Sequence, residues 1–217
     1  VMRGDTDERD PAIVDMVNLA DEAAVTEIMA AGQAELSSQG AIQFGWQGLN
    51  RMFGSTNGGR RGEMVVLSAL QHNFKSGTTL NMFKHHALYN EPYMMDKERK
   101  PMLIRMSFET SANYDTLFLF KSLKENELYE PVDLATVSVA EASKYVSQKL
   151  SAKGYTPLLV HINPSDYTFR KLMQFVDDRI AEGYEVHHLN LDYLAMISKA
   201  GCAAGPHGTD TIDLFRR

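Results

Sequence analysis

Residues 64–80, MVVLSALQHNFKSGTTL, decide how this sequence is interpreted. The apolar run at 64–67 is typical of a buried strand, and a helix is expected from Ser76 to Tyr89. The loop between them ends in Lys75 and Ser76. This order places a cation and a hydroxyl at the start of a helix, where free backbone N–H groups and the helix dipole favour a phosphate group.

The loop has the context of a phosphate-binding P-loop but lacks its glycines. The motif is G-x-x-x-x-G-K-[ST], whereas the frame here starts at Ala69 and has Phe74 before Lys75 and Ser76. Glycine permits unusual backbone angles and a close approach to phosphate, and Phe74 adds bulk where the phosphate would be wrapped. Two interpretations stay open: a divergent phosphate loop, and a helix N-terminus that contains Lys-Ser by chance.

Beyond this loop, short apolar runs alternate with helical stretches. Strands are expected at residues 102–106, 158–161 and 186–191, and helices at 48–53, 113–124, 140–150 and 167–181. This alternation predicts an α/β fold, with right-handed βαβ units and a mainly parallel sheet flanked by helices. Ligands of such sheets bind beyond the carboxyl ends of the strands.

The beginning of the chain is expected to form a separate helical segment. Residues 13–36 are rich in Ala, Glu, Met and Leu and carry an apolar stripe, and residues 37–40 are typical of a linker. We therefore expect an N-terminal linker helix segment at 1–40 and a single core domain at 41–217. The helix either docks on a neighbouring subunit or packs on its own domain.

Composition excludes several classes of protein. One cysteine excludes an intramolecular disulfide, and no run of 18 apolar residues is present to span a membrane. The net charge of -6 argues against a broad basic surface that coats nucleic acid, although a narrow basic groove remains compatible with it. A cytoplasmic protein is expected. His85–His86 and His187–His188 are adjacent pairs whose side chains diverge, so they do not predict a zinc site.

Two acidic residues follow expected strands. Glu109 comes directly after the strand at 102–106 and its Ser107-Phe108 extension, and Asp192 follows the strand at 186–191. A carboxylate just past a parallel strand, beside a triphosphate, can hold and polarise an attacking water. A second one suits a contact to Mg²⁺, either direct or through water.

The order of these segments resembles the DnaB-like hexameric helicases of the RecA superfamily. The resemblance rests on five segments that run from residue 45 to the end of the chain: Gly45-Trp46-x-x-Leu49-Asn50, Arg61-Gly62-Glu63-Met64-Val65-Val66, Ser107-Phe108-Glu109, residues 170–183 and Leu191-Asp192-Tyr193-Leu194. It implies a RecA-like P-loop NTPase core with ATP and Mg²⁺ as cofactors. In that family a catalytic glutamate takes the place of Glu109, and an aspartate at the Walker B strand takes the place of Asp192.

The resemblance also assigns roles to the residues of the loop. Lys75 is expected to be catalytic together with Glu109, and Ser76 and Asp192 to hold the metal. The nucleotide contacts are expected from Ala69, Gln71, His72, Asn73, Phe74, Lys75, Ser76 and Gly77.

By the same resemblance, the protein is an ATP-dependent replicative helicase motor that moves 5′ to 3′ on single-stranded DNA as a homohexameric ring. Primase and a helicase loader are expected partners, and a bacterial cell or a phage-infected host the setting. The small-residue loop at 199–208 is a candidate for DNA contact, with a plain surface loop as the alternative. A polar sensor strand and an arginine from the next subunit are expected to follow residue 217, so the C-terminal part of the core is expected to be missing.

Two alternatives remain. One is a RecA-like scaffold that binds DNA or assembles but hydrolyses nucleotide weakly or not at all, as Phe74 in place of glycine would suggest. The other is a RecA-family recombinase or clock-type ATPase, which shares the core but not the Asp-Tyr-Leu motif.

Overall fold

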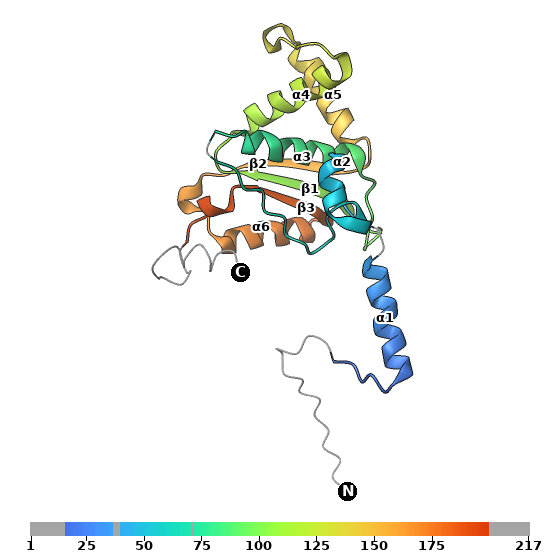
Figure 1. Ribbon diagram of the computed structural model, residues 1–217. Helices are drawn as coiled ribbons and strands as arrows, with labels where there is room; N and C mark the ends of the chain where they lie inside the picture. The colour runs from blue at the N-terminus through green and yellow to red at the C-terminus, as the bar shows by residue number, and fades with distance from the viewer. Residues whose placement is uncertain (1–15, 37–39, 71, 200–217) are drawn as a thin grey trace. The chain divides into compact units, whose positions relative to one another are not determined.

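The computed structural model describes residues 16–36, 40–70 and 72–199 (Figure 1). Contacts divide the chain into two units, Val1–Ser38 and Gln39–Arg217. The expected linker at 37–40 therefore falls almost wholly outside the described residues, as does the expected loop at 199–208 apart from Lys199.

The described helix of the first unit is α1, Glu22–Leu36. This helix was expected to begin at residue 13, but residues 16–21 are not helical, so that expectation is wrong. Residues 13–15 lie outside the described part. Asn18 and Asp21 each accept a hydrogen bond at Oδ1 from the backbone N–H two residues further on, at 3.1 and 3.0 Å. Such local bonds give the backbone an alternative to a helix, and Asp21 then caps the helix that does form.

Three parallel strands form the sheet of the second unit. In the order β2-β1-β3 they are β2 (Thr156–His161), β1 (Lys100–Ser107) and β3 (Tyr184–Asp192). Ser107 pairs with His161 on one side and with Asp192 on the other, so all three strands end at the same edge of the sheet. The three strands expected at 102–106, 158–161 and 186–191 are confirmed within these bounds, as is the α/β class with its parallel, RecA-like core.

Helices cover both faces of this sheet. They are α3 (Lys75–Tyr89), α4 (Ala112–Leu128), α5 (Val139–Ser151) and α6 (Phe169–Ala181), and shorter helices are α2 (Gln47–Met52) and the 3-10 turns Gly54–Thr56, Leu134–Thr136, Pro164–Asp166 and Leu194–Met196. Figure 1 shows α3, α4 and α5 on one side of the strands and α6 on the other. The helices expected at 48–53, 76–89, 113–124, 140–150 and 167–181 are each found, with bounds that differ by at most four residues.

Alternation along β1 explains these two layers. Leu103 is buried with side chains of α3, α4 and α5. Met102, Ile104 and Met106 are buried on the opposite face with Leu172 of α6. Successive side chains of a strand point to opposite faces, so one central strand supplies both halves of the core.

The expected buried strand at 64–67 is not formed. Its four residues have exposed fractions between 38% and 67% and, within the described ranges, pair with no strand of the sheet. A cavity of about 580 Å³ is lined both by residues 64–69 and by the outer strand β3. A strand requires a neighbour that pairs with its N–H and C=O groups, and here a cavity is shared by these residues and β3, with no pairing between them.

Candidate functional site

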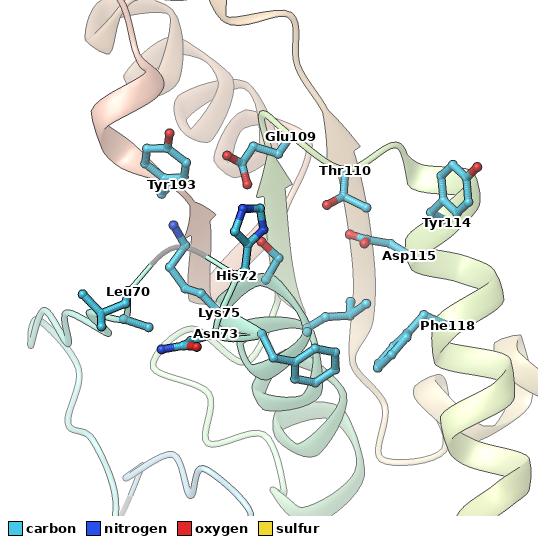
Figure 2. A pocket seen from close by; sticks show the side chains of 15 residues that line it. Leu70, His72, Asn73, Lys75, Glu109, Thr110, Tyr114, Asp115, Phe118 and Tyr193 are labelled. Atoms are coloured by element: carbon cyan, nitrogen blue, oxygen red, sulfur yellow. The ribbon is translucent and has the colours of Figure 1, made fainter.

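A second cavity, of about 880 Å³, opens where α3 begins and β1 ends (Figure 2). Most of the residues assigned to nucleotide by sequence line it: Ala69, His72, Asn73, Phe74, Lys75, Ser76, Gly77 and Glu109. Gln71 lies outside the described residues. Asp192 is not part of the lining, but the next residue, Tyr193, is. The fold thus brings the loop and the end of β1 to one cavity.

The loop turns in the way that glycines usually permit, although it has none. His72 has φ 65° and Phe74 has φ 55° with ψ 28°, both in the left-handed region. Side chains with a Cβ rarely adopt this conformation, and it costs free energy when they do. Phe74 stands at the position of the motif's second glycine, so a residue with a Cβ holds here a conformation that glycine adopts without steric cost.

The bulk of Phe74 is directed along α3. A Cβ built on Gly77 would overlap the Phe74 ring, so the ring lies directly over that glycine. The ring centroid is 6.0 Å from that of Phe118 on α4. Gly77, expected to contact nucleotide, therefore also has a packing role, since it makes room for the aromatic ring that replaces a motif glycine.

The start of α3 is a region of positive potential. The N-cap residue Phe74 offers no side-chain hydrogen bond, and no acidic residue lies in the first turn. The first backbone N–H groups of a helix have no intrahelical acceptor, and the dipole places partial positive charge there. The Nζ atom of Lys75 adds a full charge and lies 3.9 Å from the centroid of the Tyr193 ring, in a cation–π contact. The arrangement suits a polyanion.

Glu109 reaches the cavity because Ser107 shapes the turn after β1. The Ser107 hydroxyl accepts hydrogen bonds from the N–H of Glu109 at 3.3 Å and of Thr110 at 2.8 Å. Ser107 is 1% exposed, so this turn is fixed from inside the protein. Figure 2 shows Glu109, Tyr193 and Lys75 around the same end of the cavity.

Asp192 lines the cavity of about 580 Å³ instead, as Lys75 also does, and is 1% exposed. Its Oδ2 accepts a hydrogen bond from Nη2 of Arg105 at 3.0 Å, and its Oδ1 has no partner among the described residues. The same Nη2 lies 3.4 Å from the carbonyl oxygen of Ser76, which makes Ser76 and Asp192 close neighbours. A buried carboxylate oxygen without a partner, on a residue that shares a guanidinium nitrogen with Ser76, fits a hard cation such as Mg²⁺.

No larger cluster of metal ligands exists in the described part of the chain: no group of three or more His, Cys, Asp and Glu side chains could hold an ion. That absence does not weigh against Mg²⁺ at a phosphate site. Mg²⁺ is usually bound through one or two protein oxygens together with phosphate oxygens and water.

The two histidine pairs each contribute one ring to a buried contact. The His86 and His188 rings are 4.1 Å apart in a T-shaped arrangement, although each ring diverges from its own sequence neighbour. Both ring nitrogens of His86 and Nε2 of His188 are buried without a hydrogen-bond partner among the described residues. Burial, with a smaller contribution from the facing His188, lowers the pKa of His86, and burial lowers the pKa of His188 to about 4. Both rings are therefore neutral near pH 7.

Among the side chains at this site that the sequence did not predict, four bear on its chemistry. Tyr114 and Phe118 come from α4 and lie, in Figure 2, at the end of the cavity away from Lys75. Their spacing of four residues in an expected helix just after Glu109 was a usable signal. Tyr193 belongs to a quoted motif but had no role. Arg105 is a lone charge within an apolar strand, which is the signal that could have found it.

A model of the protein family described as divergent DnaB-like ATPase matches residues 1–217, the whole chain. Neither a curated protein nor a solved structure matches the chain. None of the described helices is long and apolar enough to cross a membrane.

Proposed function

The chain belongs to the divergent DnaB-like ATPase family, and we propose on this basis that it binds ATP with Mg²⁺ in the cavity at the start of α3. We further propose that hydrolysis of this ATP drives movement along single-stranded DNA. One observation carries the first proposal: Lys75 and Ser76 open a 15-residue helix in the same cavity of about 880 Å³ that Glu109 lines. Ligand pockets of about 300–1,000 Å³ enclose molecules of nucleotide size.

The phosphates would lie on the first turn of α3. The free N–H groups of that turn and the helix dipole would bind them, and Lys75 would leave the Tyr193 ring to reach the terminal phosphate. A cation–π contact is worth about 0.5–1 kcal/mol at exposed sites, less than a hydrogen bond to a charged phosphate at about 1.5–3 kcal/mol. The exchange of partners is therefore favourable.

Glu109 would orient the attacking water. It stands at the end of β1, in the cavity that Lys75 also lines, and it is held there by the Ser107 turn. Ser76 and Asp192 would hold Mg²⁺, supported by the unpartnered Oδ1 of Asp192. The metal supplies neutralisation of the charge on the phosphates when it is bound.

The nucleobase of the ATP would lie at the end of the cavity that Tyr114 and Phe118 line. Tyr114 is 72% exposed and Phe118 follows it by one helical turn on α4. Flat aromatic faces stack on nucleobases with little preference between them. The proposal therefore predicts tight binding of the phosphates and weak discrimination between purine nucleotides.

The motor activity is proposed from family membership. A homohexameric ring, 5′ to 3′ movement on single-stranded DNA, and partnership with a primase and a loader are what DnaB-like proteins imply. The net charge of -6 favours a narrow DNA path over a broad basic surface. Residues 200–208 of the proposed DNA-contact loop lie outside the described part, so this proposal rests on the sequence.

A second function, an assembly or DNA-binding scaffold with weak hydrolysis, has its own support. Phe74 holds a left-handed conformation at a free-energy cost, and Asp192 already has a cation, Arg105, as a partner. Both features are compatible with a site that binds nucleotide without rapid turnover.

ATP turnover by the full-length protein separates the two functions. The motor predicts hydrolysis that single-stranded DNA stimulates and that is lost in both Lys75→Ala and Glu109→Gln. The scaffold predicts nucleotide binding that Lys75→Ala weakens, with turnover near background in the parent protein. Arg99→Met, which removes a surface ion pair with Asp96 at 3.0 Å, is a matched control and should behave as the parent.

A further inference from the structure

Arg105 is a charged side chain in the middle of the buried central strand. It is 1% exposed, and its neighbours Ile104 and Met106 are fully buried. An isolated ion in a protein interior costs several kcal/mol, so it persists only where its partners satisfy it. The identity of those partners shows what the arginine organises.

Every N–H group of the guanidinium has an acceptor. Nε donates to Asp115 Oδ2 at 2.8 Å, Nη1 donates to Thr79 Oγ1 and Asn190 Oδ1 at 2.9 Å each, and Nη2 donates to Asp192 Oδ2 at 3.0 Å and to the carbonyl oxygen of Ser76 at 3.4 Å. One group on β1 thus ties together α3, α4 and β3, the elements that surround the phosphate site. Asn190 reinforces the network by donating from Nδ2 to the carbonyl oxygen of Thr79 at 3.1 Å.

The two residues that we assign to Mg²⁺ share one nitrogen of this guanidinium. Nη2 bonds both Ser76 and Asp192, so their separation is set by Arg105. The second carboxylate oxygen of Asp192, Oδ1, is left without a partner among the described residues. Arg105 therefore fixes Asp192 through one oxygen and leaves the other available.

The charges support the same role. Arg105 is a single cation between two buried carboxylates, Asp115 and Asp192, which are 4% and 1% exposed. The guanidinium contacts one oxygen of each carboxylate, so each of these buried groups has a cationic partner.

We infer that Arg105 is a positioning residue that holds Asp192 beside Ser76 with one carboxylate oxygen unpartnered, so that the gain in nucleotide affinity from Mg²⁺ depends on Arg105. This inference rests on the proposed function. The role inferred for Arg105 differs from that of an ordinary buried ion pair, which would stabilise the fold but would not change how much Mg²⁺ raises the nucleotide affinity. Loss of partners around a metal site costs about 10–100-fold in metal affinity.

The test is the binding of a fluorescent ATP analogue that resists hydrolysis, measured with Mg²⁺ and with EDTA. The parent protein is compared with Arg105→Met and Arg105→Lys. We expect the Mg²⁺-induced gain in affinity to fall about 10-fold in Arg105→Met, with metal-free affinity within about 3-fold of the parent. Arg105→Lys keeps the charge but loses the forked set of hydrogen bonds. Its Mg²⁺-induced gain in affinity should therefore lie between that of the parent and that of Arg105→Met.

Asp115→Asn is the matched control. It breaks the same network at similar burial but leaves the bond between Arg105 and Asp192 in place. We expect it to lower the melting temperature yet keep the parent's response to Mg²⁺. If Asp115→Asn loses that response as fully as Arg105→Met, the network is merely structural and the inference is overturned.

The remaining outcomes are also decisive. If both Arg105 variants keep the parent's gain from Mg²⁺, the inference fails while the proposed function stands. If Arg105→Met does not fold, an unchanged Mg²⁺-induced gain in Arg105→Lys overturns the inference and leaves the proposed function in place. If the parent binds no nucleotide with or without Mg²⁺, the proposed function fails and the inference falls with it.

Discussion

Replacing Phe74 with glycine and, separately, with alanine measures the strain that the phosphate loop holds. Phe74 has φ 55° and ψ 28° at the residue before α3. Both substitutions remove the same ring and its contact with Phe118. The difference between the two variants therefore reports the backbone conformation, because the lost ring contacts cancel.

The expected magnitude follows from two opposing effects. A residue with a Cβ in the left-handed region costs about 1–2 kcal/mol, which glycine avoids. Glycine in turn lowers the free energy of unfolding by about 0.4–1 kcal/mol, because an unfolded chain with glycine at this position has more conformations to lose on folding. The glycine variant should be the more stable one by about 0.5–1 kcal/mol, whereas at ordinary helix positions alanine is favoured over glycine by about 1 kcal/mol.

Urea unfolding of the two variants measures this difference directly. An alanine variant that is more stable than the glycine variant would show that residue 74 does not hold a left-handed conformation in solution. Binding of an ATP analogue by the same variants tests the position of the ring. Affinity within about 3-fold of the parent, about 0.7 kcal/mol, is expected because the ring lies over Gly77. A rise of about 10-fold or more in the glycine variant would show that the ring obstructs the phosphates.

Two further predictions concern neighbouring parts of the site. Gly77→Ala should destabilise the parent by about 1–3 kcal/mol, because the new Cβ overlaps the Phe74 ring. The same change in a Phe74→Ala background should be neutral or stabilising by up to about 1 kcal/mol, since alanine favours a helix; an equal loss in both backgrounds, measured by urea unfolding, would contradict the packing. The pKa of His188 is lowered from 6.5 to about 4, so the unfolded chain takes up the proton at a higher pH than the folded chain does. The free energy of unfolding therefore includes the full contribution of the neutral ring above about pH 7 and loses it as the pH falls toward 4. About 2 kcal/mol should be lost through His188 between pH 7 and pH 5, and His188→Leu should remove that part of the slope; an unchanged slope in urea unfolding at the two pH values would show that His188 is not buried as a neutral ring.

The strands of the sheet and the helices that cover it were predictable because the sequence patterns that indicate them are local. The apolar run before Ser107 and the periodic helices are visible in single stretches of about ten residues. Parallel order follows from their alternation. Residues 64–67 carry the same local signal but do not form a strand, because a strand also needs a partner that the local sequence does not specify.

The candidate site was predictable in part for a related reason. Lys75 and Glu109 line one cavity because each stands just beyond a regular element, and such positions gather at one edge of a parallel sheet. The network of Arg105 was not predictable, since the partners of Arg105 lie from 10 to 87 positions away from it in the sequence. The direction of the Phe74 ring depends on Gly77 and Phe118 together, and a motif comparison considers only the missing glycine.

Lys75 and the first turn of α3 are proposed to bind the phosphates of a nucleotide. Calorimetric titration of the full-length protein with an Mg²⁺-bound ATP analogue tests this proposal, beside Lys75→Ala. Loss of a hydrogen bond to a charged group, about 1.5–3 kcal/mol, should weaken binding by about 10–100-fold in the variant. The lost cation–π contact with Tyr193 should lower its melting temperature by no more than about 4 °C. Equal affinity of the parent and Lys75→Ala, or no binding by the parent, would contradict the account.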